Sequence, residues 1–362
     1  MKRRTLLTLL GLGGATLATG GYAVKRANAA NPYYSGPESD HFDGRVFFNP
    51  EGVEPRSFGD LLRWQFGGGR ARWPAEWPSP FPQAKPEERI EGERLVVTMV
   101  GHATLLIQTA GLNILTDPVW SQRVSPFSFA GPKRVNAPGV AFDDLPPIDL
   151  ALLSHNHYDH MDAATLARLH ARDNPLLVTP LGNDAIVRKS VTTMRIEARD
   201  WGGAVEAGSA RIHVEPAHHW SARGTGDRRM ALWSAFVIET AAGKIYFAGD
   251  TGFHQGRNFR AAREKHGAFR FAIIPIGAYE PRWFMEAQHQ NPDDAVEAFK
   301  LLGADHAAGM HWGTFQLTNE PIEEPRDLLL EALDREQIPR DRFRPMLPGE
   351  VWDVPPSATT GT

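Results

Sequence analysis

The segment from Ser154 to Asp162 concentrates side chains that bind metal ions. Directly after the apolar run Ile148–Leu153 it carries His155, His157, Asp159 and His160. Side chains two apart in an extended segment point the same way, so the first two histidines can hold one ion. The aspartate and the last histidine then turn away and can hold a second ion. A single histidine is more often structural, but this crowding of imidazoles and a carboxylate is relieved by divalent cations and indicates a metal site.

Two ions need more ligands than this segment supplies, and three later places in the sequence offer them. Each place lies directly after an expected strand, where a side chain can point out of the end of a sheet. The candidates are His218 or His219, Asp250 and His311. Neighbours on a strand face opposite ways, so we expect only one of the two adjacent histidines to bind.

The elements that must position these residues begin at Leu95. Runs of apolar and β-branched residues between glycines and prolines predict strands, and longer runs with helical spacing predict helices. The expected strands are Leu95–Val100, Thr104–Thr109, Leu112–Thr116, Ile148–Leu153, Leu176–Thr179, Arg211–Glu215, Leu232–Glu239, Lys244–Ala248, Phe271–Ile276, one near His306–Met310 and one around Phe343–Val351. The expected helices are Ala163–His170, with Asp162 as its N-cap, Asn183–Lys189, Pro292–Leu302 and Glu324–Glu336. Two such halves predict two sheets packed face to face with helices outside.

Composition sets limits on the chemistry. The 362 residues include 42% hydrophobic and 23% charged residues, as in an ordinary globular protein, and the net charge is −4. Without a basic excess, nucleic acid is not an expected partner. The chain has no cysteine, which excludes disulfides, thiolate zinc sites and a cysteine nucleophile. Any metal must therefore be held by His, Asp and Glu. The sequence leaves the oligomeric state undetermined.

The first residues are typical of a targeting segment. Lys2, Arg3 and Arg4 precede the apolar, glycine-rich stretch Thr5–Val24, as in a twin-arginine export signal. Ala27–Ala29 offers a cleavage site, although a stretch of about twenty residues could also remain as an anchor. We therefore expect export to the periplasm or to the outer face of the cytoplasmic membrane.

Residues 30–94 are rich in proline, glycine and aromatic residues, with one short helix expected around Phe58–Phe66. We interpret this segment as an N-terminal arm that packs its aromatic side chains onto the main domain. An additional role in a substrate groove or a lipid-docking face is compatible with that interpretation.

Several longer motifs resemble one known family. The order H-x-H-x-D-H, then His, then Gly-Asp, then His is typical of the metallo-β-lactamase superfamily. Within it, the chain resembles the branch of phospholipases D that hydrolyse N-acylphosphatidylethanolamine. The motifs are Gly101–Thr104, Leu115–Pro118, Ser154–Asp162, His219-Trp220, Ala248–Gly252, Ile274–Met285 and His311–Phe315, within a match from about Phe42 to Val351.

The resemblance implies a four-layer αββα sandwich, with two mixed sheets flanked by helices, and an assignment of the ligands. The implied domains are 1–29 (signal or anchor), 30–94 (arm), 95–353 (hydrolase domain) and 354–362 (flexible tail). His155, His157 and His219 would hold one zinc ion. Asp159, His160 and His311 would hold the second, with Asp250 bridging both. Asp117 would orient a ligand imidazole, or it is a turn residue before Pro118. His102 would either support a ligand or be structural, and we favour the structural role.

Two zinc ions in such a site share a water molecule and lower its pKa toward neutral, which gives a bridging hydroxide. Asp159 can both bind metal and orient this nucleophile. His289 matches a functional histidine of the family and is a candidate acid for the leaving group near pH 7, unless it only packs. Tyr279 and Arg282 are expected to shape the substrate pocket, where Arg282 meets a phosphate or pairs with Glu280.

The implied activity is that of a dizinc phosphodiesterase of phospholipase D type, acting on N-acylphosphatidylethanolamine-like phospholipids or related phosphodiesters, with peripheral membrane contact. Fold alone does not determine the substrate. The alternatives are a metallo-hydrolase of another ester, a lactone or a β-lactam, an iron oxidoreductase on the same ligands, and a non-catalytic binding or cell-envelope protein.

Overall fold

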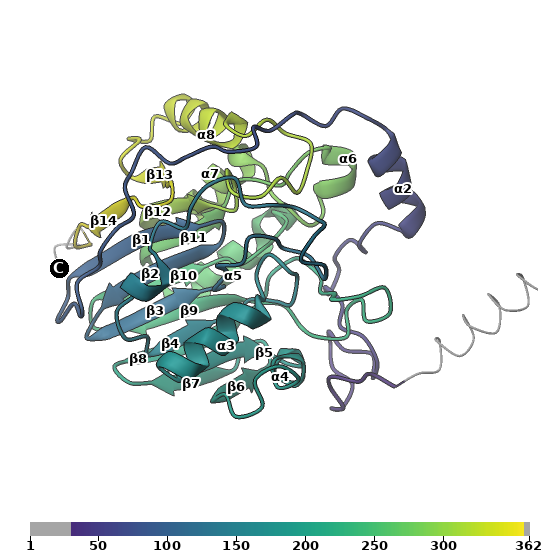
Figure 1. Cartoon of the computed structure of the whole chain (residues 1–362), viewed down its shortest axis with the longest axis horizontal. Helices are drawn as coiled ribbons and strands as arrows, with labels where there is room; N and C mark the ends of the chain where they lie inside the picture. The colour runs from purple at the N-terminus through teal and green to yellow at the C-terminus, as the bar shows by residue number, and fades with distance from the viewer. Residues whose placement is uncertain (1–29, 358–362) are drawn as a thin grey trace, which may run out of the picture.

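The structure is a computed structural model that describes residues 30–357, and this part of the chain forms two seven-stranded sheets that face each other (Figure 1). In spatial order, the first sheet consists of β14 (Val351–Val354), β1 (Leu95–Gly101), β2 (Thr104–Thr109), β3 (Leu112–Thr116), β4 (Leu150–Leu152), β5 (Leu176–Pro180) and β6 (Ile196–Arg199). The second consists of β13 (Phe343–Pro345), β12 (Ala304–Met310), β11 (Phe269–Pro275), β10 (Gly243–Phe247), β9 (Ala235–Thr240), β8 (Ala210–Glu215) and β7 (Ala204–Ala207).

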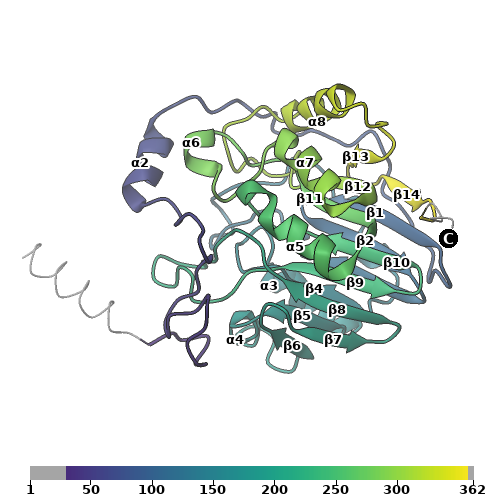
Figure 2. The same ribbon diagram turned by 180° about the vertical axis from the view of Figure 1, so that it is seen from behind.

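Helices cover the outer face of each sheet (Figures 1 and 2). On the first sheet lie α3 (Ala163–Arg172) and α4 (Asn183–Val187), and on the second lie α5 (Arg257–His266), α7 (Pro292–Leu302) and α8 (Glu324–Arg335). Asp162 is the N-cap of α3, because its carboxylate accepts the N–H of Ala164 at 3.1 Å. The predicted αββα sandwich is thus confirmed.

Fully buried aliphatic and aromatic side chains fill the space between the sheets. Leu105 and Ile107 of the first sheet belong to the same core cluster as Phe236, Phe247 and Phe271 of the second. Removing these large side chains from water is the main force that holds the two sheets together.

Strand direction brings the candidate ligands to one edge. Both β8 and β10 are antiparallel to β9 and therefore run the same way, while β10, β11 and β12 are parallel. In the first sheet, β3 is parallel to β4. The carboxyl ends of these strands are followed by the loops that contain Asp117, His155, His219, Asp250 and His311.

Most expected elements are present, with differences of a few residues at their ends. The C-terminal strand expected around Phe343–Val351 is wrong: the chain forms β13, turns at Pro348 and Gly349, and enters the other sheet as β14. Gly349 has φ +88°, and its N–H donates to the Met99 carbonyl at 2.8 Å, so the turn itself links the two sheets. Helix α5 and strands β6 and β7 were not predicted from the sequence, because their sequences are polar or short.

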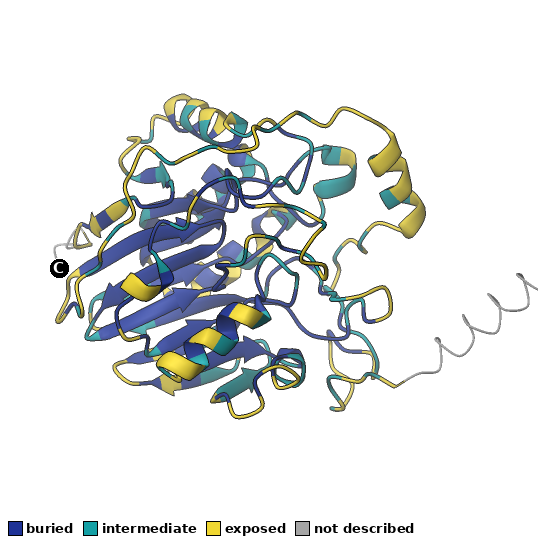
Figure 3. Ribbon diagram, viewed as in Figure 1, coloured by how far each residue is buried: buried dark blue, intermediate teal, exposed yellow. Residues whose placement is uncertain are grey.

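The segment from residue 30 to residue 94 packs onto the main body in part. Phe42 and Phe47 are buried in the core around the second sheet. Helix α2 (Phe58–Phe66) stands apart with no buried residue, beside the short helix α6 (Arg282–Met285) (Figure 3). No helix within residues 30–357 is long and apolar enough to cross a membrane. The predicted signal at 1–29 lies outside the described residues, and the domain limits stay a prediction.

Candidate metal centre

Three imidazoles converge at the end of β4. His155 Nε2 lies 2.9 Å from His157 Nδ1, which lies 3.2 Å from His219 Nε2. Two ligands of a tetrahedral zinc ion, each about 2.0–2.1 Å from the metal, are about 3.3 Å apart. The spacing of these nitrogen atoms therefore fits a shared cation.

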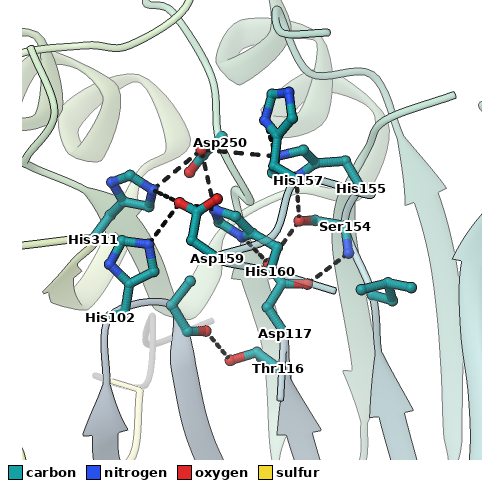
Figure 4. Close-up of polar contacts among 12 residues, drawn as sticks. His102, Thr116, Asp117, Ser154, His155, His157, Asp159, His160, Asp250 and His311 are labelled. Carbon is teal, nitrogen blue, oxygen red and sulfur yellow. Dashed lines mark hydrogen bonds and ion pairs between the residues drawn. The ribbon is translucent and has the colours of Figure 1, made fainter. Parts of the chain in front are cut away.

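A second set of ligand atoms surrounds one oxygen of Asp250 (Figure 4). Its Oδ2 lies 3.1 Å from His160 Nε2 and 3.2 Å from His311 Nε2. Asp159 Oδ2 lies 3.4 Å and 3.3 Å from the same two nitrogen atoms. The Asp250 oxygen is also 3.9 Å from His155 Nε2 and 3.8 Å from His219 Nε2, so it lies between the two sets.

The burial of this cluster supports the assignment to metal. Asp250 is 3% exposed, and its Oδ1 and the Nε2 atoms of His160 and His311 are buried without a hydrogen-bond partner in the described structure. Orphaned polar atoms inside a protein are costly unless something binds them. Together with the donor set of imidazoles and carboxylates, they fit a pair of divalent cations.

The two sets differ in their electrostatics. Burial lowers the pKa of His157 and of His219 to about 3, so these imidazoles are neutral and keep a free lone pair. Burial also lowers the pKa of His311, but the negative charges of Asp250 and Asp159 stabilise the protonated ring. Their effect is larger, and the pKa of His311 is raised to about 9. His160 follows the same pattern, and its pKa lies well above the usual value. In the second set, therefore, protons occupy the positions that a cation would take.

Asp117 supports ligands of both sets (Figure 4). Its Oδ2 accepts from His160 Nδ1 at 2.6 Å and from the Ser154 hydroxyl at 2.6 Å. The same hydroxyl oxygen lies 2.9 Å from His155 Nδ1. Holding Nδ1–H in this way leaves Nε2 of each ring free for a cation. The structure thus places Asp117 where a carboxylate that orients ligands is expected, and it adds Ser154, which the sequence analysis missed.

His102 lies inside the centre and contacts a ligand, although the structural role was the one favoured from the sequence. Its Nε2 is 2.9 Å from Asp159 Oδ2, and its carbonyl accepts the backbone N–H of His311 at 3.0 Å. His102 and His311 have φ of +58° and +65°, in the left-handed region that residues other than glycine seldom adopt. Such strain collects at functional sites, but an isolated histidine in a turn gives no spacing signal in the sequence.

The structure distinguishes the two adjacent histidines. His219 points into the centre and donates from Nδ1 to the Gln288 carbonyl at 3.0 Å. His218 turns away: its Nδ1 bonds the Ala287 carbonyl at 2.6 Å, and its Nε2 accepts the N–H of Val53 at 3.2 Å. Both therefore hold the loop that carries His289, but His219 alone contacts the ligand cluster.

His289 borders the centre, with its ring centroid 5.1 Å from that of His219 and 5.5 Å from that of His311. Burial lowers its pKa to about 3, so it is neutral at pH 7. This environment argues against an acid poised near pH 7, the role expected from the sequence. A neutral imidazole can instead donate a hydrogen bond or accept a proton.

Tyr279 and Arg282 are not among the residues that line the cavity beside the ligand cluster, and their role in a substrate pocket stays a prediction. Tyr279 is 2% exposed and donates to Glu324 at 2.7 Å. The Arg282 guanidinium pairs with Asp294 at 3.0 Å and donates to the His289 carbonyl at 3.0 Å. The predicted ion pair with Glu280 is not formed, because the Glu280 carboxylate instead accepts the Arg282 backbone N–H at 3.0 Å.

A cavity of about 430 Å³ borders the ligand cluster, and His157 and His289 form part of its wall. The rest of the wall comes from the arm, the loop after β8 and helix α6, and most of it is apolar. The other lining residues are Pro55, Arg56, Ser57, Phe58, Leu61, Trp64, Trp220, Ala222, Gly224, Thr225, Arg228, Phe284, Met285 and Gln288. The sequence suggested a groove formed by the arm but not the segments that complete it.

Comparison with known proteins agrees with this fold and site. The family described as "Beta-lactamase superfamily domain" matches residues 112–312. The chain belongs to this superfamily of metal-dependent hydrolases.

Within the superfamily, the chain lies in the branch of N-acylphosphatidylethanolamine-hydrolysing phospholipases D. It is 41% identical to N-acyl-phosphatidylethanolamine-hydrolyzing phospholipase D 1 of Caenorhabditis elegans, over 72% of this chain and 76% of that protein. The mitochondrial enzyme of the same description from Saccharomyces cerevisiae is 32% identical over 67% of this chain and 53% of that protein. In fold, the chain is similar to an isothiocyanate hydrolase from Delia radicum gut bacteria, with a TM-score of 0.56, 21% identity and coverage of 71% and 98%.

Proposed function

We propose that the protein is a zinc-dependent phosphodiesterase of phospholipase D type that acts on N-acylphosphatidylethanolamine-like lipids. The observation that carries the proposal is the contact between the ligand cluster and the apolar cavity, through His157 and His289. An amphiphile with its acyl chains in this cavity would present its phosphodiester to the cluster. The relatives described as N-acylphosphatidylethanolamine-hydrolysing enzymes support the same substrate class.

In this proposal the seven ligands hold two zinc ions, which polarise the phosphodiester and activate water when bound. The protein supplies the rest. Asp117 fixes His160 and, through Ser154, His155. Asp159, held by His102, can accept a hydrogen bond from the attacking water. Neutral His289, at the cavity wall, can donate a hydrogen bond to the leaving oxygen of the N-acylethanolamine.

Access from a lipid surface forms part of the proposal. Phe58, Leu62 and Phe66 follow each other at helical spacing on α2 and are 69%, 42% and 86% exposed. An exposed apolar stripe of this kind inserts into the interface of a bilayer. Phe58 also lines the cavity, so a lipid drawn from the membrane would meet it beside this helix.

The test is a substrate panel on the purified, exported protein together with metal analysis. We expect about two zinc ions per chain and release of phosphatidate from N-acylphosphatidylethanolamine, both lost in Asp250→Asn. Hydrolysis of a lactone or a carboxylic ester without phosphodiesterase activity would refute the lipid substrate. Stoichiometric iron would refute the zinc assignment.

We also propose export by the N-terminal segment, as its twin-arginine pattern suggests. Cell fractionation should place the protein in the periplasm or on the outer face of the cytoplasmic membrane, and Arg3→Lys combined with Arg4→Lys should retain it inside. Unchanged distribution of this variant would contradict the proposal.

A further inference from the structure

The cavity beside the metal centre carries positive charge without negative charge. Its sixteen lining residues include two arginines, Arg56 and Arg228, and neither aspartate nor glutamate. In a mostly apolar wall, a cation exerts a strong field because little water screens it. The wall therefore has a sign preference that the metal ligands do not explain.

Arg228 is the arginine that is fixed in place. Its Cζ lies 4.5 Å from the centre of the Trp220 ring, and its Nη2 donates to the Arg56 carbonyl at 2.7 Å. The same indole ring lies 4.6 Å from the ring of His157. The indole of Trp220 thus lies between the guanidinium of Arg228 and the metal ligand His157. A molecule bound in the cavity can therefore contact Arg228 and the metal centre at the same time.

The charge of Arg228 is not neutralised within the described structure. No ion pair within residues 30–357 involves Arg228, and the Nε atom of Arg228 is buried without a hydrogen-bond partner. Glu54, the carboxylate whose charge reaches Arg228, is bonded to Arg229 instead. A half-buried guanidinium held without a counter-ion gains more from an anionic ligand than a solvated one does.

We propose that Arg228, assisted by Arg56, is a specificity-determining group that admits phosphodiester amphiphiles with a net negative charge and rejects those whose head group carries an ammonium. The inference rests on the proposed function. Acylation of an amine removes its positive charge, so an N-acylated ethanolamine phospholipid is a net anion. Phosphatidylcholine and phosphatidylethanolamine keep their cationic group, which the arginine repels.

The test compares the zinc-loaded wild type with Arg228→Gln, using two short-chain substrates in monomeric solution. One is an N-acylphosphatidylethanolamine and the other is a phosphatidylcholine with the same glycerol-linked chains. We expect Arg228→Gln to lower kcat/KM for the anion about 10- to 100-fold, chiefly through KM. For the zwitterion, kcat/KM should be unchanged or should rise, so the preference collapses.

Two further variants separate charge from packing. Arg228→Lys should retain most of the preference because it keeps the charge. Arg188→Gln is the matched control: Arg188 also binds backbone carbonyls, of Thr192 and Met194, but lies outside the cavity wall, and its loss should change neither substrate. Equal losses for both substrates in Arg228→Gln, without rescue by lysine, would overturn the proposal.

Measuring the binding of the two amphiphiles tests charge selection independently of the proposed reaction. If the wild type cleaves neither lipid, the proposed function fails, and tryptophan fluorescence then measures binding of the same two amphiphiles. A preference for the anion that Arg228→Gln abolishes would still support charge selection. Equal affinity for both amphiphiles in the wild type would refute it.

Discussion

The two ligand sets of the metal centre are built from similar residues but have different charge. The first set, His155, His157 and His219, consists of imidazoles that burial keeps neutral. The second set has its own carboxylate, Asp159, and its imidazoles, His160 and His311, hold protons because two carboxylates face them. A cation entering the first set finds free lone pairs, whereas one entering the second must displace protons.

The largest effect is expected where the two sets meet. Asp250→Asn keeps the shape but removes the negative charge that both sets share, so both ions should be lost. Loss of a residue that only hydrogen-bonds a metal ligand lowers activity by up to about 100-fold. Loss of the shared ligand itself should lower activity by more than this. Inductively coupled plasma analysis of the purified variant should find less than one metal ion per chain. Two retained ions would show that the sets do not depend on this carboxylate.

Asp117→Asn should weaken both sets, but unequally. The carboxylate bonds His160 directly and reaches His155 only through Ser154. We expect about a 10- to 100-fold loss of metal affinity at the second set and a smaller loss at the first. Competition with a chelator of known affinity measures the two steps. Ser154→Ala removes the link to His155 and one hydrogen bond to Asp117 but leaves the contact between Asp117 and His160. It serves as the control and should weaken the first set more than the second.

His102→Gln sharpens the comparison further, because His102 contacts Asp159 and touches only the second set. We expect the affinity for the metal ion of the second set to fall about tenfold, the lower end of the range for removing a partner of a ligand, and the affinity for the other ion to stay unchanged. Equal weakening of both ions, seen by the same titration, would mean that the sets are coupled more tightly than their contacts suggest.

The smallest effect concerns the stability of the metal-free protein at different pH. His311 has a folded-state pKa of about 9 against 6.5 for the model imidazole, so its stabilisation is complete below about pH 6.5 and is lost as pH rises through 9. His157 and His219, with pKa near 3, act in the opposite sense, and their contribution is lost as pH falls below 6.5.

Thermal unfolding of the metal-free protein should therefore show Tm declining on both sides of neutral pH. The free energy of unfolding should fall by about 1.4 kcal/mol per pH unit for each proton that differs between the folded and unfolded states. Zinc should abolish the alkaline decline, since the metal replaces the protons of the second set. An alkaline decline of the same size with and without zinc would contradict this assignment.

Local spacing predicted the first half of the centre, because strand geometry relates His155 to His157 directly. Asp250 and His311 were predictable as side chains that follow strands. The choice of His219 over His218 came from the resemblance, and the structure shows why the two differ: the carbonyls of Gln288 and Ala287 turn the rings apart. His102 could not be assigned, since its contact with Asp159 joins a turn and a loop that are distant in sequence.

The cavity was the least predictable part. Arg228, Trp64 and Phe284 come from three separate segments, and only tertiary packing makes them neighbours. Arg282 and Tyr279 lie in a long recognisable motif, but their side chains serve the framework around His289 and Glu324. A sequence motif identifies residues of a family, but it does not give the direction of each side chain, which depends on the residues that pack around it.

The turn at Gly349 has a consequence for solubility. It lets one short stretch of chain supply an outer strand to each sheet, with β14 covering β1 and β13 covering β12. Trp352 and Val354 are 3% and 1% exposed, so this cover is packed as firmly as the core. Without it, the seven-residue strands β1 and β12 would form these edges, whereas β13 and β14 have three and four residues and expose fewer unpaired backbone groups. Short edge strands are one way in which proteins limit aggregation. The stretch that links the two sheets therefore also shortens the edge that each sheet offers to neighbouring molecules.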